Sequence, residues 1–365
     1  MNRVQALQRV AALALLIAWP SAGLAAPLSL RVVAAGDIGV LLVIDVPLGE
    51  RPMRWLLDTG SSHNLVHSAV PAEPRRSAPV TVQTAAGPVT GEPVRLLDLR
   101  LGTPPVPELH ALRVDLTQAL GELATQVDGV LGLPFLDGRR LHVDLQALQI
   151  ELDATAGPAP SREPLAIERV DGWPAVLLDL PSGPARLLID TGAAGGVILW
   201  PPGATTLNVR RIEALRLAGQ VRAQVPAVTW PGGGLARALP RQLHGVLGMA
   251  PLDGCRFTLD LSADTLAVHD CARTALPGGF GLQWVMHDGR LTLARVWPDS
   301  PAAAAGLRAG EVVVSVQGRP APASALAADA RLRAAPTLQL AVQGPDGARA
   351  IELQRSYFLP AWQAR

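Results

Sequence analysis

The chain has 365 residues, of which 49% are hydrophobic and 17% charged, and its formal net charge is +1 at pH 7. This length allows two or three domains of roughly 100–200 residues, and 35 Gly and 33 Pro favour a mainly β fold with many turns and short strands. The hydrophobic content excludes a disordered chain, the near-zero charge gives no attraction to nucleic acid, and the absence of lysine excludes P-loop or Schiff-base lysine chemistry.

Residues 1–26 are predicted to be an export signal. Two arginines precede the apolar run Val10–Trp19, and small residues allow cleavage near Ala25 or Ala26. The apolar run is shorter than the roughly 20 residues that span a bilayer. An uncleaved anchor is the alternative. We therefore expect a periplasmic or secreted protein with no membrane span after cleavage.

The sequence Asp-Thr-Gly occurs twice, each time directly after an apolar run. Asp58 follows Trp55-Leu56-Leu57, and Asp190 follows Leu187-Leu188-Ile189. A strand that ends in a carboxylate, a small polar residue and a Gly places the acid in a tight turn at the edge of a core. A single copy is typical of a structural turn. Two copies raise the possibility that two carboxylates meet and share a proton.

Residues Val80–Gly91 are predicted to form a hairpin after the first acid turn. Its strands alternate around a Gly-Pro tip, so Ala86, Gly87 and Pro88 are the expected tip of a flap. The second half of the chain has no obvious counterpart. One lobe is therefore expected to carry a flap that the other lacks.

The duplication extends beyond the acid turns. Residues 128–140 align with residues 244–256, and both copies contain an apolar-apolar-Gly segment that runs into a strand hairpin. A repeated β unit of this size predicts two similar lobes related by pseudo-two-fold symmetry, over residues 27–153 and 165–273. The Gly- and Pro-containing stretch at residues 154–164 is the predicted linker.

The two cysteines, Cys255 and Cys271, lie in the second half. An antiparallel register with Leu261 opposite Thr265 also sets Cys255 opposite Cys271. In an oxidising compartment this pair should form a disulfide, worth roughly 3 kcal/mol for a loop of about 15 residues. Two free buried thiols are the alternative. Two cysteines without a nearby His pair make no zinc site, so neither a metal nor a cofactor is expected.

The repeat stops at about Pro277, where the composition changes. Gly279-Phe280-Gly281-Leu282 precedes a predicted strand, and Ser300–Val313 follows it. Residues 274–360 resemble a PDZ domain of the kind that follows bacterial envelope serine proteases. The resemblance implies that the loop of Gly279, Phe280, Gly281 and Leu282 presents N–H groups to the free carboxyl terminus of a peptide or protein, which pairs as an added strand. A β/α packing domain without a ligand is the alternative.

The two halves together resemble the pepsin and retropepsin class of aspartic proteases over residues 30–272. The resemblance implies two β-barrel lobes, each contributing one acid loop, with Asp58 and Asp190 as the catalytic pair. It also implies a set of residues that support the pair: Thr59, Gly60, Ser61, Thr191 and Gly192. In such loops the threonines cross-link the two turns, the glycines permit their close approach, and Ser61 donates to Asp58. On this basis we expect Asp58 to be the better-stabilised anion and Asp190 to carry the proton more often.

These features predict a monomeric, exported aspartic endopeptidase that cleaves peptides or unfolded proteins. The ionised acid would activate a water, and the protonated acid would hydrogen-bond the substrate carbonyl. Pepsins use a flap Tyr, but the single tyrosine here is Tyr357, so the flap must act through its backbone and small side chains. The alternative is a non-catalytic, exported peptide-binding or scaffold protein that uses the PDZ groove.

Four further residues lie near the acid turns in the sequence or are expected to pack beside them. His63 and His67 lie just past the first turn, but no metal-ligand or Ser-His spacing accompanies them, so both are expected to be loop residues. Trp55 and Trp200 are expected to pack near the acid loops. An envelope-type serine protease is disfavoured because no Gly-Ser-Gly nucleophile setting is present.

Overall fold

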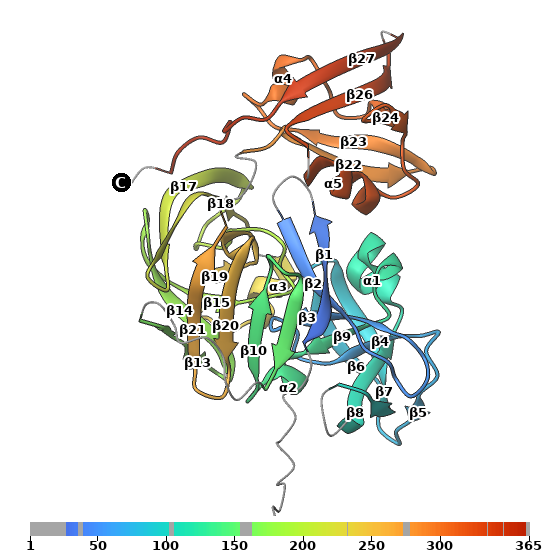
Figure 1. Cartoon of the computed structure of the whole chain (residues 1–365), viewed down its shortest axis with the longest axis vertical. Coiled ribbons are helices and arrows are strands. Elements are labelled where there is room, and N and C mark those ends of the chain that lie inside the picture. Colours follow the sequence, from blue (N-terminus) through green and yellow to red (C-terminus); the bar gives the residue numbers. More distant parts are fainter. Residues whose placement is uncertain are drawn as a thin grey trace, which may run out of the picture.

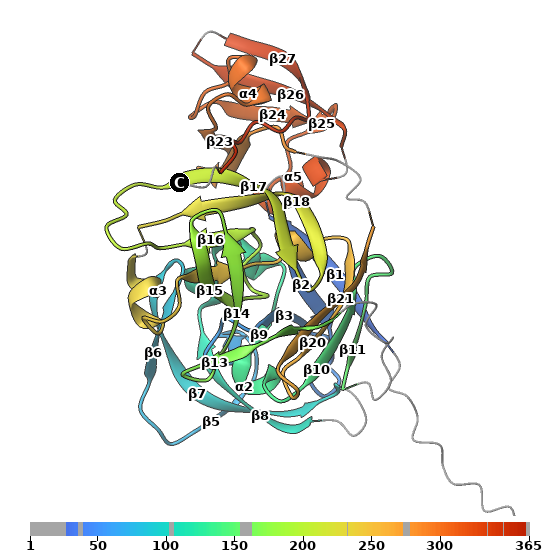
Figure 2. The same ribbon diagram turned by 90° about the vertical axis from the view of Figure 1, so that its left-hand side faces the viewer.

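The computed structural model describes residues 27–35, 39–101, 106–153, 163–231, 233–272, 278–333, 335–345 and 347–362. The predicted export signal and most of the predicted linker lie outside these residues. The described part is mainly β and contains three sheets (Figures 1 and 2). The strand order of each sheet is an open path, so the expected closed β-barrels are wrong: the edge strands do not return to pair with one another.

The largest sheet has 14 strands and contains the first half of the chain together with three strands of the second half. Its strands are β1 (Leu28–Ala35), β2 (Gly39–Asp45), β3 (Arg54–Asp58), β4 (Leu65–His67), β5 (Glu73–Pro74), β6 (Val80–Thr84), β7 (Gly87–Leu99), β8 (Val106–Val114), β9 (Gly129–Gly132), β10 (Arg140–Asp144), β11 (Gln149–Leu152), β12 (Leu165–Ala166), β20 (Cys255–Asp260) and β21 (Thr265–Cys271). Three short helices accompany the first half: α1 (Leu116–Leu120), the 3-10 helix η1 (Gly121–Thr125) and α2 (Leu133–Leu136).

The second sheet has seven strands and carries the second acid turn. Its strands are β13 (Glu168–Val170), β14 (Trp173–Leu180), β15 (Gly183–Ile189), β16 (Val197–Leu199), β17 (Asn208–Leu217), β18 (Gln220–Thr229) and β19 (Gly245–Leu247). Helix α3 (Gly233–Ala238) and the 3-10 helix η2 (Ala250–Leu252) lie before and after β19 in the chain.

The same order of pairing surrounds both acid turns. In the first sheet the strands run β2-β3-β9-β4-β8-β7, and in the second they run β14-β15-β19-β16-β18-β17. The parallel pairs also correspond, because β3 pairs with β9 as β15 pairs with β19. Each acid therefore lies at the carboxyl end of a strand that has a parallel neighbour.

The two halves share one sheet, which the sequence did not predict. Strand β20 of the second half pairs antiparallel with β10 of the first half, with Leu141 opposite Leu259 and Val143 opposite Phe257. All four side chains are buried in a core cluster that includes residues of both halves. The two halves are thus joined through one sheet, while the second acid turn itself lies in the second sheet.

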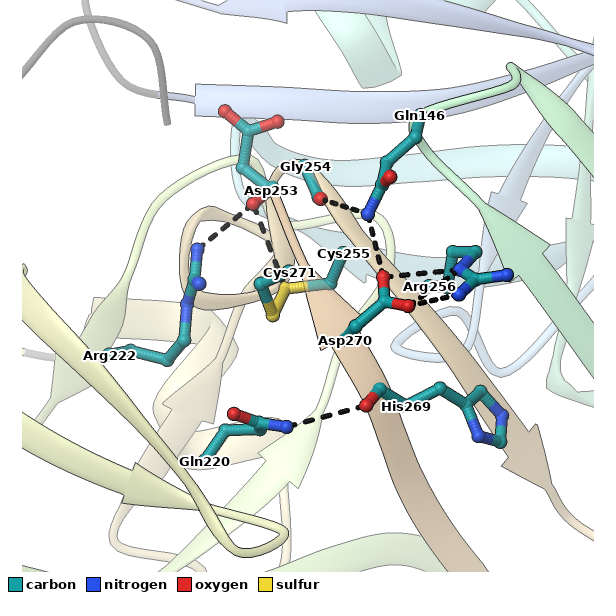
Figure 3. The surroundings of a disulfide bond; sticks show 10 residues. All are labelled: Gln146, Gln220, Arg222, Asp253, Gly254, Cys255, Arg256, His269, Asp270 and Cys271. Atoms are coloured by element: carbon teal, nitrogen blue, oxygen red, sulfur yellow. Dashed lines mark hydrogen bonds and ion pairs between the residues drawn. A yellow bond between two sulfur atoms is a disulfide. The ribbon is translucent and has the colours of Figure 1, made fainter. Parts of the chain in front are cut away.

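The disulfide between Cys255 and Cys271 is confirmed (Figure 3). The predicted register near the turn is wrong by one residue, since Thr265 lies opposite Asp260 and not Leu261. The carboxylate of Asp260 accepts hydrogen bonds from Ser262 and Ala263, so the turn begins one residue early. A bulge between Arg256 and Phe257 then restores the pairing of the cysteines.

The third sheet has six strands, β22 (Leu282–His287), β23 (Arg290–Val296), β24 (Val312–Val316), β25 (Arg319–Pro320), β26 (Thr337–Gly344) and β27 (Gly347–Gln354), with helices α4 (Pro301–Ala304) and α5 (Ala325–Arg333). It has its own core around Phe280 and Trp284 and lies at one end of the molecule in both views (Figures 1 and 2). Within the part of the chain that the structure describes, no helix is long and apolar enough to cross a membrane.

Candidate active site

The acid turns follow strands that are buried along most of their length. Asp58 is the last residue of β3 and lies opposite Gly132 of β9. Asp190 directly follows β15, and its N–H donates to the carbonyl of Leu247 in β19 at 3.0 Å. The apolar residues before each acid are buried in the core. The strands therefore end where the core ends, and the carboxyl groups emerge at its edge.

Thr59 and Thr191 connect the two turns by four hydrogen bonds. The hydroxyl of Thr59 donates to the carbonyl of Ile189 at 2.6 Å, and the hydroxyl of Thr191 donates to the carbonyl of Leu57 at 2.8 Å. Each hydroxyl also accepts from the other threonine's N–H, at 3.0 and 3.1 Å. Both side chains are buried, so the cross-link is shielded from water.

Gly60 and Gly192 each face the acid of the opposite turn. A Cβ atom on Gly60 would lie 2.4 Å from Cγ of Asp190, and one on Gly192 would lie 2.3 Å from Cγ of Asp58. The N–H of each glycine donates to the carboxylate of its own turn at 2.9 Å. A side chain at either glycine would therefore occupy the space in which the two carboxyl groups lie.

Burial raises the pKa of both acids. The pKa of Asp58 lies well above its usual range because of burial, the charge of Asp190 and a hydrogen bond with that residue. Burial is also the largest cause that raises the pKa of Asp190. Two adjacent carboxylates resist simultaneous ionisation, so one proton is retained over a broad pH range and belongs to the pair.

The hydroxyl of Ser61 does not donate to Asp58, although the backbone N–H of Ser61 donates to the carbonyl of Asp58 at 3.2 Å and also lowers the pKa of the Asp58 carboxyl. Its hydroxyl donates instead to the carbonyl of His63 at 2.8 Å, within the same loop. The expected asymmetry, with Asp58 as the better-stabilised anion, is not supported, because the hydrogen bond between the two acids raises the pKa of Asp58 and lowers that of Asp190. His63 lies at the cleft, where burial lowers its pKa, and its Nδ1 is 2.9 Å from the hydroxyl of Ser62.

Asn64 is a structural residue of the site that the sequence analysis missed. Its side-chain oxygen accepts from the N–H of Gly132 at 2.9 Å, and its amide donates to the carbonyl of His110 at 2.9 Å. In the second half a backbone contact takes this place, from the N–H of Gly248 to the carbonyl of Gly196 at 2.8 Å. The signal for this role in the sequence was an Asn that comes immediately before an apolar run.

Steric contacts also explain why both apolar-apolar-Gly segments end in glycine. A Cβ on Gly132 would lie 2.4 Å from the carbonyl oxygen of His63, and one on Gly248 would lie 2.5 Å from that of Gly195. These segments therefore pack directly against the acid loops, and a side chain at either final glycine would overlap the loop backbone.

A cleft of about 380 Å³ contains both acids and is lined by both halves of the chain. The β6–β7 hairpin contributes Val82–Ala85 to its wall. The second half contributes three tryptophans and two leucines of α3 or its end: Trp173, Trp200, Trp230, Leu235 and Leu239. The wall is therefore largely apolar around two acidic groups.

The β6–β7 hairpin turns at Ala85 and Ala86, not at the expected Gly-Pro tip. Gly87 pairs with Thr84, and Pro88 follows within β7. The hydroxyl of Thr84 donates to the carbonyl of Gly87 at 2.8 Å and accepts from the N–H of Ala86 at 3.2 Å, which closes the turn one residue earlier. Trp55 lies in the core behind the site, where its indole donates to the carbonyl of Val46.

The expected peptide loop of the third sheet is divided between a cavity and a core. Gly279 and Leu282 line a cavity of about 530 Å³. Phe280 is fully buried under the guanidinium of Arg355, which lies 4.7 Å from the ring centroid. Gly281 has a φ of 76°, and a Cβ there would lie 2.1 Å from that of Ser300.

Among the described residues no cluster of three His, Cys, Asp or Glu side chains is arranged to hold a metal ion.

Comparison with known proteins identifies part of this arrangement. A family model described as aspartyl protease matches residues 44–135, a range that includes Asp58, the β6–β7 hairpin and β9. Asp190 lies outside the matched range. A search of curated proteins finds no match to the chain. The match supports an aspartyl protease-like domain in the first half and a protease-type function.

Substituting either loop glycine should separate the acid turns. We expect Gly60→Ala and Gly192→Ala each to lower the free energy of unfolding by about 1–3 kcal/mol, because the added methyl group overlaps the facing carboxyl group. Gly195→Ala is the matched control, since a Cβ there has no neighbour within 4 Å. Urea denaturation checks this. Wild-type stability in both loop variants would show that the turns are not in contact.

The raised pKa values also predict how stability depends on pH. A carboxyl group whose folded pKa exceeds its unfolded value of about 3.9 favours folding at low pH, and this contribution is lost as pH rises through the folded pKa. The double variant Asp58→Asn/Asp190→Asn does not lose stability in this way, because its amide side chains do not titrate. Its stability relative to wild type should therefore increase from about pH 4 upward.

Urea denaturation over a pH series measures this difference. Asp179→Asn is the control, because Asp179 is exposed on β14, and its pH profile should parallel that of wild type. A constant difference between the double variant and wild type at all pH values would contradict the raised pKa values.

Proposed function

We propose that the protein is an aspartic endopeptidase in which Asp58 and Asp190 activate a water for attack on a peptide bond. One observation carries the proposal: each carboxyl group lies against the glycine of the opposite turn, and burial raises the pKa of both. The aspartyl protease match over residues 44–135 supports the same reaction class.

The chemistry follows from the shared proton. The ionised carboxylate takes a proton from the water, whose oxygen adds to the peptide carbonyl carbon. The protonated carboxyl donates to the carbonyl oxygen and stabilises the negative charge that develops there. The carboxyl that took a proton from the water then donates it to the peptide nitrogen, and the C–N bond breaks, which releases an acid and an amine. One proton on the pair is the state that supplies both functions.

The cleft suits an extended peptide with apolar side chains. The β6–β7 hairpin and three tryptophans of the second half line the cleft that contains the two acids. We propose that Ala86, Gly87 and Pro88 belong to a flap that acts through backbone groups, because the chain's single tyrosine is Tyr357. The substrate is then an unfolded protein or a peptide.

The proposal extends to the domain organisation. The repeated strand order around the acid turns supports two related lobes, residues 27–153 and 165–273, joined by a linker at 154–164. Residues 274–360 form a PDZ-like domain that binds peptide carboxyl termini, supported by the separate core of the third sheet. The arginines and apolar run within residues 1–26 support export to the periplasm or the medium.

Single substitutions of the acids test the reaction directly. We expect Asp58→Asn and Asp190→Asn each to lower kcat/KM on a fluorescent peptide library by at least about 10²–10⁴-fold, the usual contribution of a general acid or base. Asp179→Asn should cleave at the wild-type rate, and pepstatin should inhibit the wild type.

The pH profile gives a second readout in the same assay. Cleavage should fall as the pH rises above the raised pKa of the pair, because the remaining proton is lost. Undiminished cleavage by both Asn variants would overturn the assignment. A folded wild-type protein that binds peptides but cleaves none at any pH would instead support the non-catalytic alternative.

A further inference from the structure

Helix α3 of the second half contacts the β6–β7 hairpin of the first half. Figure 2 shows the helix next to β6, at the left of the view. A Cβ atom on Gly234 of α3 would lie 2.9 Å from Cδ and Nε2 of Gln83 and 3.0 Å from its Oε1. The side-chain amide of Gln83 therefore lies flat against the backbone of α3, and only glycine leaves room for this contact.

This contact lies at the cleft that contains the two acids. Gln83 lines the cleft from the first half, and Leu235 and Leu239 line it from the second. The hydroxyl groups of Thr59 and Thr191 join the halves at the acid turns, and Gln83 joins them again at α3. Because Gln83 and both acids line the same cleft, the cleft lies between two contacts that connect the halves.

An endopeptidase substrate must enter such a cleft as a segment from the middle of a chain. Such a segment has no free end to thread between the two contacts, so one of them must open. The threonine cross-link consists of four buried hydrogen bonds. The amide of Gln83 donates within its own hairpin, to the carbonyl of Thr84 at 3.0 Å, so it meets Gly234 through packing. The contact between Gln83 and Gly234 is therefore the one that opens.

Helix α3 has the features of a segment that moves. Each of its six residues is partly or fully exposed. The helix begins at Gly233, whose φ of 61° lies in the left-handed region that glycine adopts freely. At the other end, Leu239 is buried, and its N–H donates to the carbonyl of Leu235 at 3.2 Å. The helix is thus anchored at its end and begins at a glycine that can serve as a hinge.

The equivalent segment of the first half is held more firmly. α1 and η1 lie between β8 and β9, as α3 lies between β18 and β19, and Ala119 of α1 also lines the cleft. Leu116 and Ala119 are buried. The carboxylate of Glu122 in η1 accepts from the N–H groups of Met286 in β22 and Ala325 in α5. Of the two equivalent segments at the cleft, α3 is therefore the one that is suited to move.

We propose that α3 is a second lid, which separates from the β6–β7 hairpin to admit a polypeptide segment and then closes on it. Leu235 lines the cleft, so closure places it against a side chain of the substrate and makes it a specificity-determining residue for an apolar group. This inference rests on the proposed hydrolysis of peptides, but opening of the lid controls binding as well as cleavage, and each can be measured without the other.

A pair of cysteines tests whether the lid must open. Cys255 and Cys271 already form a disulfide, so Gln83→Cys/Gly234→Cys adds two thiols that can pair only with each other. Removal of the Gln83 amide also leaves room for the new Cβ at Gly234. Mild oxidation of the folded protein should join the two thiols, which mass spectrometry of tryptic fragments detects. The two single variants and the wild type, taken through the same oxidation and reduction, are the controls.

The probe is an unfolded linker rich in Leu, Phe and Val between two fluorescent proteins, because folded ends cannot pass through a closed cleft. The oxidised pair should cleave the linker at least about tenfold more slowly than the reduced pair, as expected for a closed lid. In a chain that also carries Asp58→Asn, oxidation should weaken binding of the uncleaved probe by a similar factor of about ten, measured by thermophoresis.

Substitutions of Leu235 test its contact with the substrate. Leu235→Ala leaves space for a larger side chain, so the preference for Trp over Leu at one position of a peptide library should rise by about tenfold. Leu235→Trp fills this space and should shift the preference toward Ala at the same position. Leu207→Ala is the matched control, because Leu207 is exposed on the loop before β17, outside the residues that line the cleft. The same shifts should appear in binding when Asp58→Asn is present.

The lid and the hydrolysis fail in different ways. Undiminished cleavage by the oxidised pair would overturn the lid and leave the hydrolysis standing. Binding that depends on the lock, with no cleavage by the wild type, would overturn the hydrolysis and leave the lid standing. A folded pair that forms no disulfide would show that Gln83 and Gly234 are not in contact. An unchanged side-chain preference in both Leu235 variants would overturn the role of Leu235, and a wild type that neither binds nor cleaves the probe would overturn both proposals.

Discussion

The hydroxyl groups of Thr59 and Thr191 hold two distant parts of the chain in one site. Each reaches a carbonyl of the opposite strand end and accepts from the other threonine's N–H. This cross-link brings Gly60 and Gly192 against the facing carboxyl groups. It also makes the desolvation of Asp58 and Asp190 possible, since neither turn alone would bury its acid. The shared sheet is a second connection between the halves, because β10 of the first pairs with β20 of the second.

The parts of the site that follow local rules were predictable from the sequence. Two Asp-Thr-Gly turns after apolar runs led to Asp58 and Asp190, and strand alternation led to the pairing of Cys255 with Cys271. Details that depend on side-chain competition were not. Ser61 donates within its own loop, Asp260 begins a turn one residue early, and Thr84 closes the hairpin before Gly87. Pairing of β20 with β10 was not predictable, because contacts between distant strands leave no local signal.

The third sheet is fastened to both halves by polar contacts at the two ends of α5. Glu122 of the first half accepts from the N–H of Ala325 at the start of the helix, and Arg333 near its end pairs with Asp253 of the second half at 2.5 Å. The chain then returns to β17, where the N–H of Trp362 donates to the carbonyl of Arg211 at 2.8 Å. Arg211 also lines the cavity of about 530 Å³, together with Gly195 and Gly196, which follow the second acid turn.

The central claim is that the carboxyl groups of Asp58 and Asp190 touch and hold one proton between them. Neutron diffraction from deuterated crystals at mildly acidic pH tests this most directly, because it locates both the oxygen atoms and the deuterium. We predict carboxyl oxygens of the two residues within hydrogen-bonding distance and a single deuterium atom on the pair. Carboxyl groups that point away from each other, or two carboxylates without a deuterium atom, would contradict the account.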